Sequence, residues 1–450
     1  MKFIFILIIS ITTLAILIIV HESGHFLVAR FFGVHVKRFS IGFGKILFRK
    51  KDRFGTEFVI SSIPFGGYVK IADESFDILK QKCRFFLKDR VFTTRILIIL
   101  GGSIFNFLLA ILIYWIIFIF GLSFYKPIIG MVRPNSIAFN SNFTPNMEIK
   151  SIDNIKTPDW STVNLVLINK IGQNQVNIEV FSHIDQSSIK KMIDLSQLNF
   201  NNSEKNIFHH LGIFPVHNLP QNVITYIELN SPFINSGLKI GDRIISVNNK
   251  KINSNNIFDF CVSECIYNDS ILFNIERNGK EINLISRLKI KNITKYNSKN
   301  NFGIYLSSDF ILNKSKIIEK HHPVSALYYA IKKVFYLIYF ISGIMIKMLF
   351  KNLDFYHLNG PISFVKGVSF SLKTGLIYYF MFVSLISINL GIINLLPIPI
   401  LDGGNLLLII IEKIRGKKIS LNTEKLIFNI SMLFLLILMG FALFNDLIHF

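Results

Sequence analysis

The segment HESGH at residues 21–25 combines two imidazoles and a carboxylate within about one helical turn. On a helix, residues i and i+4 lie on the same face, so His21 and His25 can offer ring nitrogens to one zinc ion. Glu22 then stands beside the metal, where a carboxylate can serve as the general base for an attacking water. The spacing therefore predicts a hydrolytic zinc site with Glu22 as the catalytic residue.

Two histidines that only cap a surface helix are the alternative interpretation of this segment. The preceding residues 3–20 carry no charge. Ionisable groups at the end of an apolar span are costly unless they pair, bind a metal or reach the interface. Zinc ligation is therefore the favoured interpretation.

A catalytic zinc normally takes three protein ligands and keeps a fourth position for water. His35 precedes a strand-like segment punctuated by glycines and is expected to be an interfacial polar residue. The better candidate is Asp402, within NLLPIPILDGGN at residues 394–405. Pro397 and Pro399 interrupt a helix there, and a broken helix in a membrane is tolerated where it is buried in protein or lines a wet cavity. The alternative is that Asp402 caps the next helix from a loop.

Four apolar segments are long enough to carry these motifs across a bilayer core of about 30 Å. They cover about residues 3–30, 96–122, 376–396 and 426–443. A cleaved signal peptide is the alternative for the first segment, but no small-residue cleavage site follows it. Residues 326–350 are also apolar, yet lysines leave only thirteen residues uninterrupted, which predicts an interfacial or buried helix.

The composition agrees with a membrane protein. Hydrophobic residues make up 51% of the chain and charged residues 17%, whereas soluble domains carry roughly 25% charge. The formal net charge of +21 could indicate nucleic acid or anionic lipid. The apolar composition favours membrane lipid, and no nucleic-acid partner is expected. The three cysteines, Cys83, Cys261 and Cys265, are too few for a disulfide framework.

Lysines and arginines set the orientation of the spans. They crowd the segment between the first two spans and recur at residues 413–418, so both loops are predicted to be cytoplasmic. Both termini and the long middle segment then lie outside. With this topology the first and third spans bring His21, His25 and Asp402 to a similar depth.

HExxH in the first span and NxxPxPxLDGG in the third resemble the motifs of the site-2 protease family of intramembrane zinc proteases. The resemblance covers essentially the whole chain. It implies Zn²⁺ as the cofactor, His21, His25 and Asp402 as its ligands, and Glu22 as the catalytic base. It also implies that Asn394 positions the substrate or stabilises the oxyanion. A hydrogen bond from Asn394 to backbone freed by the prolines is the open alternative.

The cytoplasmic loop at about residues 55–72 contains alternating polarity and paired glycines, which predicts a hairpin or an edge strand. Gly66, Gly67 and Tyr68 match the membrane-associated β-loop of the same family. By that resemblance the strand edge would hold an unwound substrate through β-addition. An ordinary cytoplasmic hairpin is the alternative.

The second span carries a further resemblance. GGSIFNFLLA at residues 101–110 is similar to the family's G-P-x-x-N segment, with Asn106 retained. Ser103 stands where proline is usual, so a proline-made kink is not expected to carry over.

The middle segment resembles a pair of circularly permuted PDZ domains. Residues 219–310 contain Ser236-Gly237-Leu238 and the Gly241-Asp242 turn before an alternating strand. Residues 123–218 repeat the order with the glycines eroded, because Pro145-Asn146-Met147 stands where Leu-x-x-Gly-Asp is expected. Such domains bind extended peptide ends at a sheet edge, and the eroded turn leaves peptide binding by the first copy in question.

Together these features predict a polytopic α-helical membrane protein with four transmembrane helices, a membrane-associated β-loop and two inserted PDZ-like α+β domains. The expected parts are a membrane part at residues 1–122, a degenerate PDZ-like domain at 123–218, a second one at 219–310, and a C-terminal membrane part at 311–450.

The family resemblance implies an intramembrane endopeptidase of the bacterial inner membrane, with the PDZ-like domains and both termini periplasmic. Its substrates would be single-span membrane proteins, such as an anti-sigma factor, already trimmed by an upstream site-1 protease, and possibly remnant signal peptides. The outside domains would then act as a size filter. Two alternatives belong to other classes. A non-catalytic scaffold with structural zinc needs a fourth protein ligand, which is not evident, and a zinc transporter fits poorly with a fixed three-ligand site beside Glu22.

Overall fold

The computed structural model describes most of the chain. The described residues are 2–71, 90–183, 186–196, 207–216, 222–227, 231, 233, 236–251, 270–277, 279–287, 304–306, 316–349, 360–417 and 419–448. The three cysteines lie outside these ranges. The chain forms two compact units, one of residues 1–122, 320–345 and 355–450, the other of residues 123–319 and 346–354.

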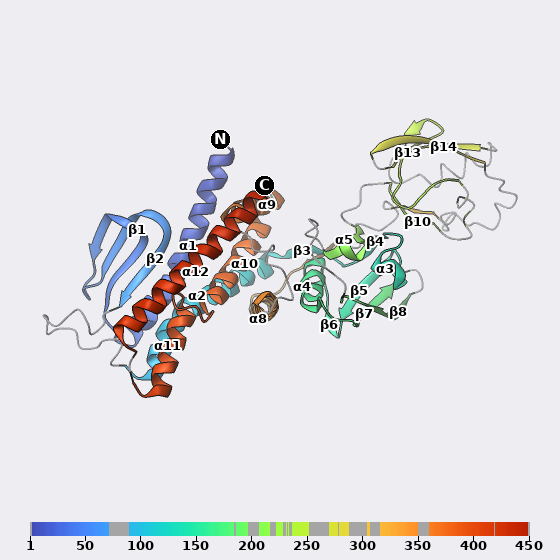
Figure 1. The fold of residues 1–450 in the computed structure, drawn as a ribbon. Coiled ribbons are helices and arrows are strands. Elements are labelled where there is room, and N and C mark those ends of the chain that lie inside the picture. The colour runs from blue at the N-terminus through green and yellow to red at the C-terminus, as the bar shows by residue number, and fades with distance from the viewer. Residues whose placement is uncertain are drawn as a thin grey trace. The chain divides into compact units, whose positions relative to one another are not determined.

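The first unit is built from long apolar helices and one sheet (Figure 1). Its helices are α1 (Lys2–Phe31), α2 (Phe92–Phe120), α9 (Pro361–Thr374), α10 (Leu376–Asn394), α11 (Asp402–Arg415) and α12 (Leu421–Ile448), together with most of α8 (Pro323–Leu349). Five of these helices are long and apolar enough to cross a membrane. The polytopic helical class expected from the sequence is therefore present.

The fifth candidate span is α8, where the sequence predicts an interfacial or buried helix and only four spans in total. The structure forms one continuous helix there, and its stretch Pro323–Lys347 has a mean hydropathy of 1.5, the lowest of the five. Lys332 and Lys333 interrupt the apolar run but do not end the helix, because lysine is a good helix former and its long side chain can reach polar surroundings. The count of four spans is not confirmed.

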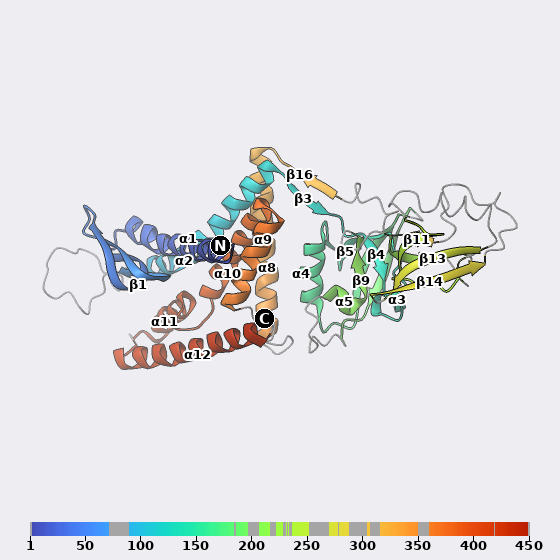
Figure 2. The ribbon, with the colours of Figure 1, turned by 90° about the horizontal axis from the view of Figure 1, so that it is seen from above.

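Glycines bring the first two helices into close contact. A Cβ atom on Gly24 would overlap the carbonyl oxygen of Gly101, and one on Gly101 would lie 2.8 Å from the carbonyl oxygen of Gly24. Small residues allow such an approach in lipid, where dispersion and hydrogen bonds hold helices together. Helix α2 also packs against α10, so it lies alongside both α1 and α10 (Figures 1 and 2).

The sheet of this unit consists of β1 (Val36–Lys51) and β2 (Glu57–Ile71). β1 turns at Gly42 and Gly44, which have φ angles of 87° and 89°. Its first half pairs with both ends of β2, since Ser40 lies opposite both Tyr68 and Val59, and its second half pairs with the start of β2. Phe26 and Ile98 belong to the buried cluster that joins this sheet to α1 and α2. The expected strand at 55–72 is β2, and its partner β1 occupies the strand-like segment that follows His35.

The second unit contains two four-stranded sheets of the same order. The first is β6-β5-β7-β8 and the second is β12-β11-β13-β14. Each is accompanied by a two-stranded sheet, β4 with β9 and β10 with β15, and a further strand pair joins β3 to β16. The strands are β3 (Leu122–Tyr125), β4 (Ile129–Val132), β5 (Met147–Ile152), β6 (Ile155–Lys156), β7 (Val176–Ser182), β8 (Ser187–Ile193), β9 (Ile213–Pro215), β10 (Ile224–Ile227), β11 (Arg243–Val247), β12 (Lys250–Lys251), β13 (Ser270–Arg277), β14 (Lys280–Arg287), β15 (Ile304–Leu306) and β16 (Lys316–Glu319), with helices α3 (Ile137–Asn140), α4 (Trp160–Lys170) and α5 (Ile207–Leu211).

Equivalent backbone contacts relate the two repeats. The amide of Asn146 donates to the carbonyl of Ile129, and the amide of Gly241 donates to the carbonyl of Ile224, each 2.8–2.9 Å long. Both Asn146 and Gly241 have positive φ angles, 67° and 98°. Asparagine tolerates this left-handed conformation better than other residues with a side chain. The turn that looks eroded in sequence therefore keeps its backbone shape.

Candidate metal centre

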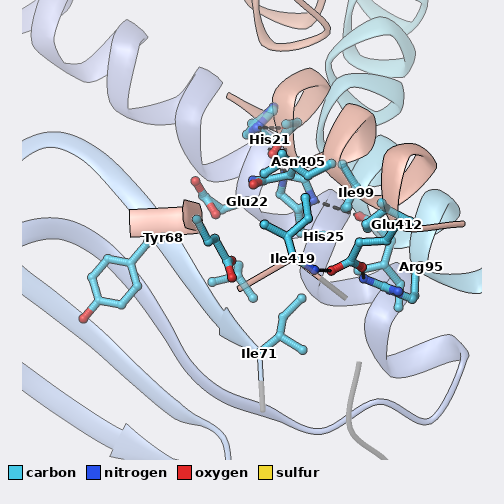
Figure 3. A pocket seen from close by; sticks show the side chains of 16 residues that line it. His21, Glu22, His25, Tyr68, Ile71, Arg95, Ile99, Asn405, Glu412 and Ile419 are labelled. Carbon is cyan, nitrogen blue, oxygen red and sulfur yellow. Dashed lines mark hydrogen bonds and ion pairs between the residues drawn. The ribbon is translucent and has the colours of Figure 1, made fainter. Parts of the chain in front are cut away.

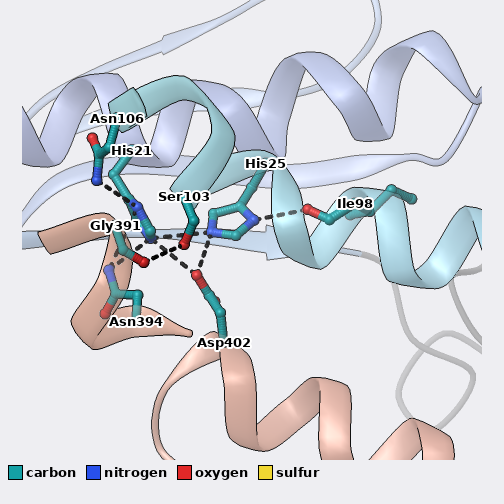
Figure 4. A network of polar contacts seen from close by, with 8 residues as sticks. All are labelled: His21, His25, Ile98, Ser103, Asn106, Gly391, Asn394 and Asp402. Atoms are coloured by element: carbon teal, nitrogen blue, oxygen red, sulfur yellow. Dashed lines mark hydrogen bonds and ion pairs between the residues drawn. The ribbon is translucent and has the colours of Figure 1, made fainter. Parts of the chain in front are cut away.

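Three side chains from two distant segments converge within the first unit. His21 and His25 lie one turn apart on α1, and Asp402 is the first residue of α11. The Nε2 atoms of His21 and His25 lie 3.1 Å and 3.2 Å from Asp402 Oδ2, and 3.2 Å from each other (Figure 4). The structure thus brings together the three residues that the sequence predicts as ligands.

This donor set fits a zinc ion. Two imidazole nitrogens and a carboxylate oxygen are preferred zinc ligands, and their three atoms lie within 4.8 Å of one another. Asp402 Oδ2 is buried, and the two imidazoles are its only polar neighbours in the part of the chain that the structure describes. Among the described residues, no fourth His, Cys, Asp or Glu joins the group. A three-ligand arrangement leaves a position for water, as in catalytic rather than structural sites.

The helix break after α10 places Asp402. The amide of Leu401 donates to the carbonyl of Ile398 at 2.8 Å, so the segment with the two prolines forms a compact turn. A Cβ atom on Gly403 would overlap the carbonyl oxygen of Leu395, and one on Gly404 would overlap that of Ile398. The paired glycines therefore let this turn fold back over the start of α11, with Asp402 directed toward α1.

Gly102 on α2 provides the space for the two imidazoles. A Cβ atom at this position would lie 2.5 Å from His21 Cε1, 2.7 Å from His21 Nε2 and still closer to His25 Nε2. The sequence analysis did not identify Gly102, although it noted the segment around it. The sequence signal that could have identified Gly102 was the pair of glycines at residues 101 and 102 in a helix of otherwise bulky apolar residues.

Polar groups from α2 and α10 surround the imidazoles on their outer side. His25 Nδ1 lies 2.9 Å from the carbonyl oxygen of Ile98, and His21 Nδ1 lies 3.1 Å from Asn106 Nδ2. Asn394, at the end of α10, places its Nδ2 atom 3.3 Å from His21 Nε2. Ser103 Oγ donates to the carbonyl of Gly391 at 3.0 Å, so the serine that replaces the usual proline links α2 to α10.

A cavity of about 370 Å³ opens beside this cluster (Figure 3). Its lining includes Glu22, the three predicted ligands, and Tyr68, Val69 and Ile71 from β2. The Glu22 carboxylate accepts a hydrogen bond from the backbone amide of Val69. The end of β2 therefore forms one wall of the cavity and contacts the predicted base.

The three residues predicted on the β-loop have different surroundings. Tyr68 lines the cavity. Gly67 packs on the base, because a Cβ atom there would lie 3.2 Å from Glu22 Cγ. Gly66 has a φ angle of 127° and packs against the ring of Phe43 instead. Within the described residues, neither glycine belongs to the cavity lining.

Three charged residues at the cavity, Arg95, Glu412 and Glu424, were not predicted as site residues. Arg95 on α2 and Glu412 on α11 form an ion pair of 3.2 Å, and both line the cavity. The sequence signal for Arg95 was a positive charge just before the second apolar span, which indicates topology, whereas no pattern in the sequence singled out the two glutamates.

The chain is similar to known proteins over nearly its whole length. A family model described as peptidase family M50 matches residues 9–438. "Protease RseP" of Yersinia pestis is 38% identical over 437 residues, which cover 97% of each chain. "Regulator of sigma-E protease RseP" of Escherichia coli strain K12 is 37% identical over 441 residues, again with 97% of each chain covered. A "putative zinc metalloprotease" of Vibrio cholerae is 34% identical over 454 residues, with 97% coverage.

Proposed function

The chain is a metalloprotease of peptidase family M50, and from this premise we propose that it is a zinc-dependent endopeptidase that cleaves the transmembrane segment of single-span proteins. The observation that carries the proposal is the convergence of His21, His25 and Asp402 at a cavity that also contains Glu22. These elements belong to a unit of membrane-length helices. This membership supports hydrolytic chemistry within the membrane part of the protein.

In this proposal His21, His25 and Asp402 hold Zn²⁺, which when bound polarises the scissile carbonyl. Glu22 accepts a proton from the attacking water and then delivers it to the leaving amine. The hydrogen bond from the Val69 amide keeps the Glu22 carboxylate on the cavity side of α1. Asn394 lies beside the His21 imidazole and supplies an amide that can hold the substrate carbonyl or the oxyanion.

The end of β2 offers a place for the substrate backbone. A helix cannot be cleaved until its peptide bonds are exposed, so the substrate is bound in an extended conformation. We place it next to Gly66, Gly67 and Tyr68, where main-chain hydrogen bonds replace those of the substrate helix. The contact of Gly67 and Val69 with Glu22 supports this placement, because it puts a bound strand close to the base.

The second unit is proposed to contain two PDZ-like domains, with the repeated strand order as support. They would face the periplasm of a bacterial inner membrane and exclude substrates that a site-1 protease has not trimmed. An anti-sigma factor is the substrate class that we propose first, since two of the relatives above are named for sigma-E regulation or as RseP. Remnant signal peptides are a second class of short single-span substrate.

The test is cleavage of a tagged, trimmed single-span anti-sigma fragment by the purified protein in detergent, with zinc content recorded. Glu22→Gln is expected to keep zinc and lose cleavage, because the amide cannot accept the proton. Asp402→Ala is expected to lose both zinc and cleavage. Stoichiometric zinc with no cleavage of any trimmed substrate would contradict the proposal.

The size filter needs a separate experiment. Removal of residues 126–310 is expected to permit cleavage of an untrimmed substrate while leaving cleavage of the trimmed one in place. Continued rejection of the untrimmed substrate by a variant that still cleaves the trimmed one would contradict the filter.

A further inference from the structure

The two histidines of the metal centre differ in what their outer ring nitrogens contact. His25 Nδ1 lies 2.9 Å from the backbone carbonyl of Ile98. A carbonyl oxygen can only accept a hydrogen bond, so His25 Nδ1 carries a proton. In the neutral imidazole this leaves the Nε2 lone pair available to a metal ion held together with Asp402.

His21 has the side-chain amide of Asn106 in the corresponding place. Asn106 is fully buried, with 0% of its surface exposed, and its Nδ2 lies 3.1 Å from His21 Nδ1. Its Oδ1 is also buried and has no hydrogen-bond partner in the described part of the chain. A half-turn of the amide exchanges these two atoms, and the choice between them is assigned from the surrounding hydrogen bonds.

The cluster of His21, His25 and Asp402 lies on the Nε2 side of the His21 ring, and this decides which atom of the Asn106 amide faces Nδ1. The His21 Nε2 atom is the one that points to Asp402 and His25, at 3.1 Å and 3.2 Å. For Nε2 to bind a metal it must be unprotonated, so Nδ1 carries the proton and needs an acceptor. The other amide near this ring, that of Asn394, lies closer to Nε2, at 3.3 Å, than to Nδ1, at 3.5 Å. A buried N–H without an acceptor is costly.

We infer that Asn106 is a positioning residue whose amide oxygen accepts a hydrogen bond from His21 Nδ1–H and so holds the imidazole ready to bind zinc. This inference rests on the proposed function, because it assigns a role toward the zinc ion that the function requires. With this arrangement the two histidines are equivalent. Each donates a hydrogen bond from Nδ1–H to an oxygen of α2, His25 to a backbone carbonyl and His21 to a side-chain amide.

Contacts from α10 hold Asn106 in place. Ser387 Oγ donates to the backbone carbonyl of Asn106 at 2.8 Å. This serine is itself fully buried. The backbone of Asn106 is therefore held against α10, and its side-chain amide extends from this fixed position toward His21.

Three variants test the inference with a readout other than activity. Asn106→Leu keeps the size of the side chain and removes both polar atoms, whereas Asn106→Asp keeps an acceptor oxygen. Ser103→Ala is the matched control, because it lies on the same buried face of α2 and removes a hydrogen bond to Gly391 without touching an imidazole. Zinc affinity is measured by competition with a chelator on the full chain in detergent, and the visible spectrum is recorded after cobalt substitution.

Asn106→Leu is expected to weaken zinc binding by about 10- to 100-fold and to change the cobalt spectrum. Asn106→Asp and Ser103→Ala are expected to bind zinc within about threefold of the wild type, since each keeps an acceptor at His21. The thermal midpoint of the metal-free Asn106→Leu protein should match the wild type, which separates loss of the acceptor from loss of the fold.

Wild-type zinc affinity in Asn106→Leu, or an equal loss in Asn106→Asp and Asn106→Leu, would overturn the inference. A wild-type protein that binds no zinc would instead overturn the proposed function. If Asn106→Leu does not fold, the comparison of Asn106→Asp with Ser103→Ala decides: a tenfold loss in Asn106→Asp alone overturns the inference, and wild-type affinity in both supports it.

Discussion

Helices α2 and α12 have nearly the same hydropathy but contribute very differently to the molecule. Their mean hydropathies are 2.7 and 2.5 and their candidate spans contain 29 and 27 residues. In the most apolar stretch of α2, 33% of the residues are buried, against 11% in α12. Hydropathy identifies both as membrane helices but does not tell which one helps to form the metal centre.

The difference lies in the small and polar residues of one helix face. The buried face of α2 includes Gly101, Gly102, Ser103 and Asn106 within two turns. Small residues admit the neighbouring helices, and the polar ones bond to groups that lipid could not satisfy. The centre of α12 exposes large apolar side chains instead, such as Leu433, Phe434 and Ile437.

The largest expected effect comes from Gly102→Ala. The new Cβ atom would lie 2.5 Å from His21 Cε1 and would also meet His25, so both imidazoles must move away from Asp402. We expect zinc affinity and peptide cleavage to fall by at least about 100-fold. Zinc content and cleavage of a trimmed substrate measure this. Normal zinc binding in this variant would show that α2 does not confine the site.

A smaller effect is expected from Asp446, the buried acid near the end of α12. Its carboxylate accepts hydrogen bonds from the amides of Gly360, Ile362 and Ser363 and so caps the start of α9. Asp446→Ala leaves these donors without their acceptor and should reduce stability by about 1–3 kcal/mol. Thermal unfolding in detergent measures this, and Asp446→Asn, which keeps one acceptor oxygen, should lose less. Equal midpoints for all three proteins would show that the cap contributes no stability.

Ser103→Ala is expected to have a modest effect. The variant removes the hydrogen bond from Ser103 Oγ to the Gly391 carbonyl, and interhelical hydrogen bonds of this kind average roughly 0.6 kcal/mol. A slightly lower thermal midpoint with cleavage within about threefold of the wild type is the expected result. Loss of zinc would mean that Ser103 acts on the metal centre directly.

The smallest effect is expected from Gly440→Ala in α12, which is the counterpart of Gly102→Ala. Apart from its chain neighbours and the backbone of its own helix, no atom of the described residues lies within 4 Å of the Cβ that this change adds. Because alanine is favoured over glycine inside a helix by up to about 1 kcal/mol, the thermal midpoint should stay the same or rise. Cleavage should not change. A strong loss of activity would reveal a partner surface on α12.

Local patterns in the sequence were sufficient to single out the three residues that converge in the structure. The i, i+4 spacing places His21 and His25 on one face of any helix, and the structure has that helix. The prolines and glycines around Asp402 predict a helix break followed by a turn, which the structure forms between α10 and α11. These features follow from backbone geometry over a few residues.

The number of membrane spans was less predictable, because it does not follow from local backbone geometry. Lys332 and Lys333 divide an apolar run in the sequence, but a helix continues through them. Whether such a helix crosses or lies along the membrane depends on its neighbours and on where its lysines reach polar groups. Composition over a window contains neither piece of information.

By itself, the sequence determined that the protein has apolar helices, a two-histidine motif with an adjacent acid, and a broken helix that ends in an acid. The tertiary structure decided which face of α2 meets the imidazoles, and therefore which side chains surround Gly102 and Asn106. It also brought Asp402 to within 3.2 Å of two residues at the other end of the chain. The physical reason is that helix geometry is local, whereas the approach of two helices depends on how their side chains fit together.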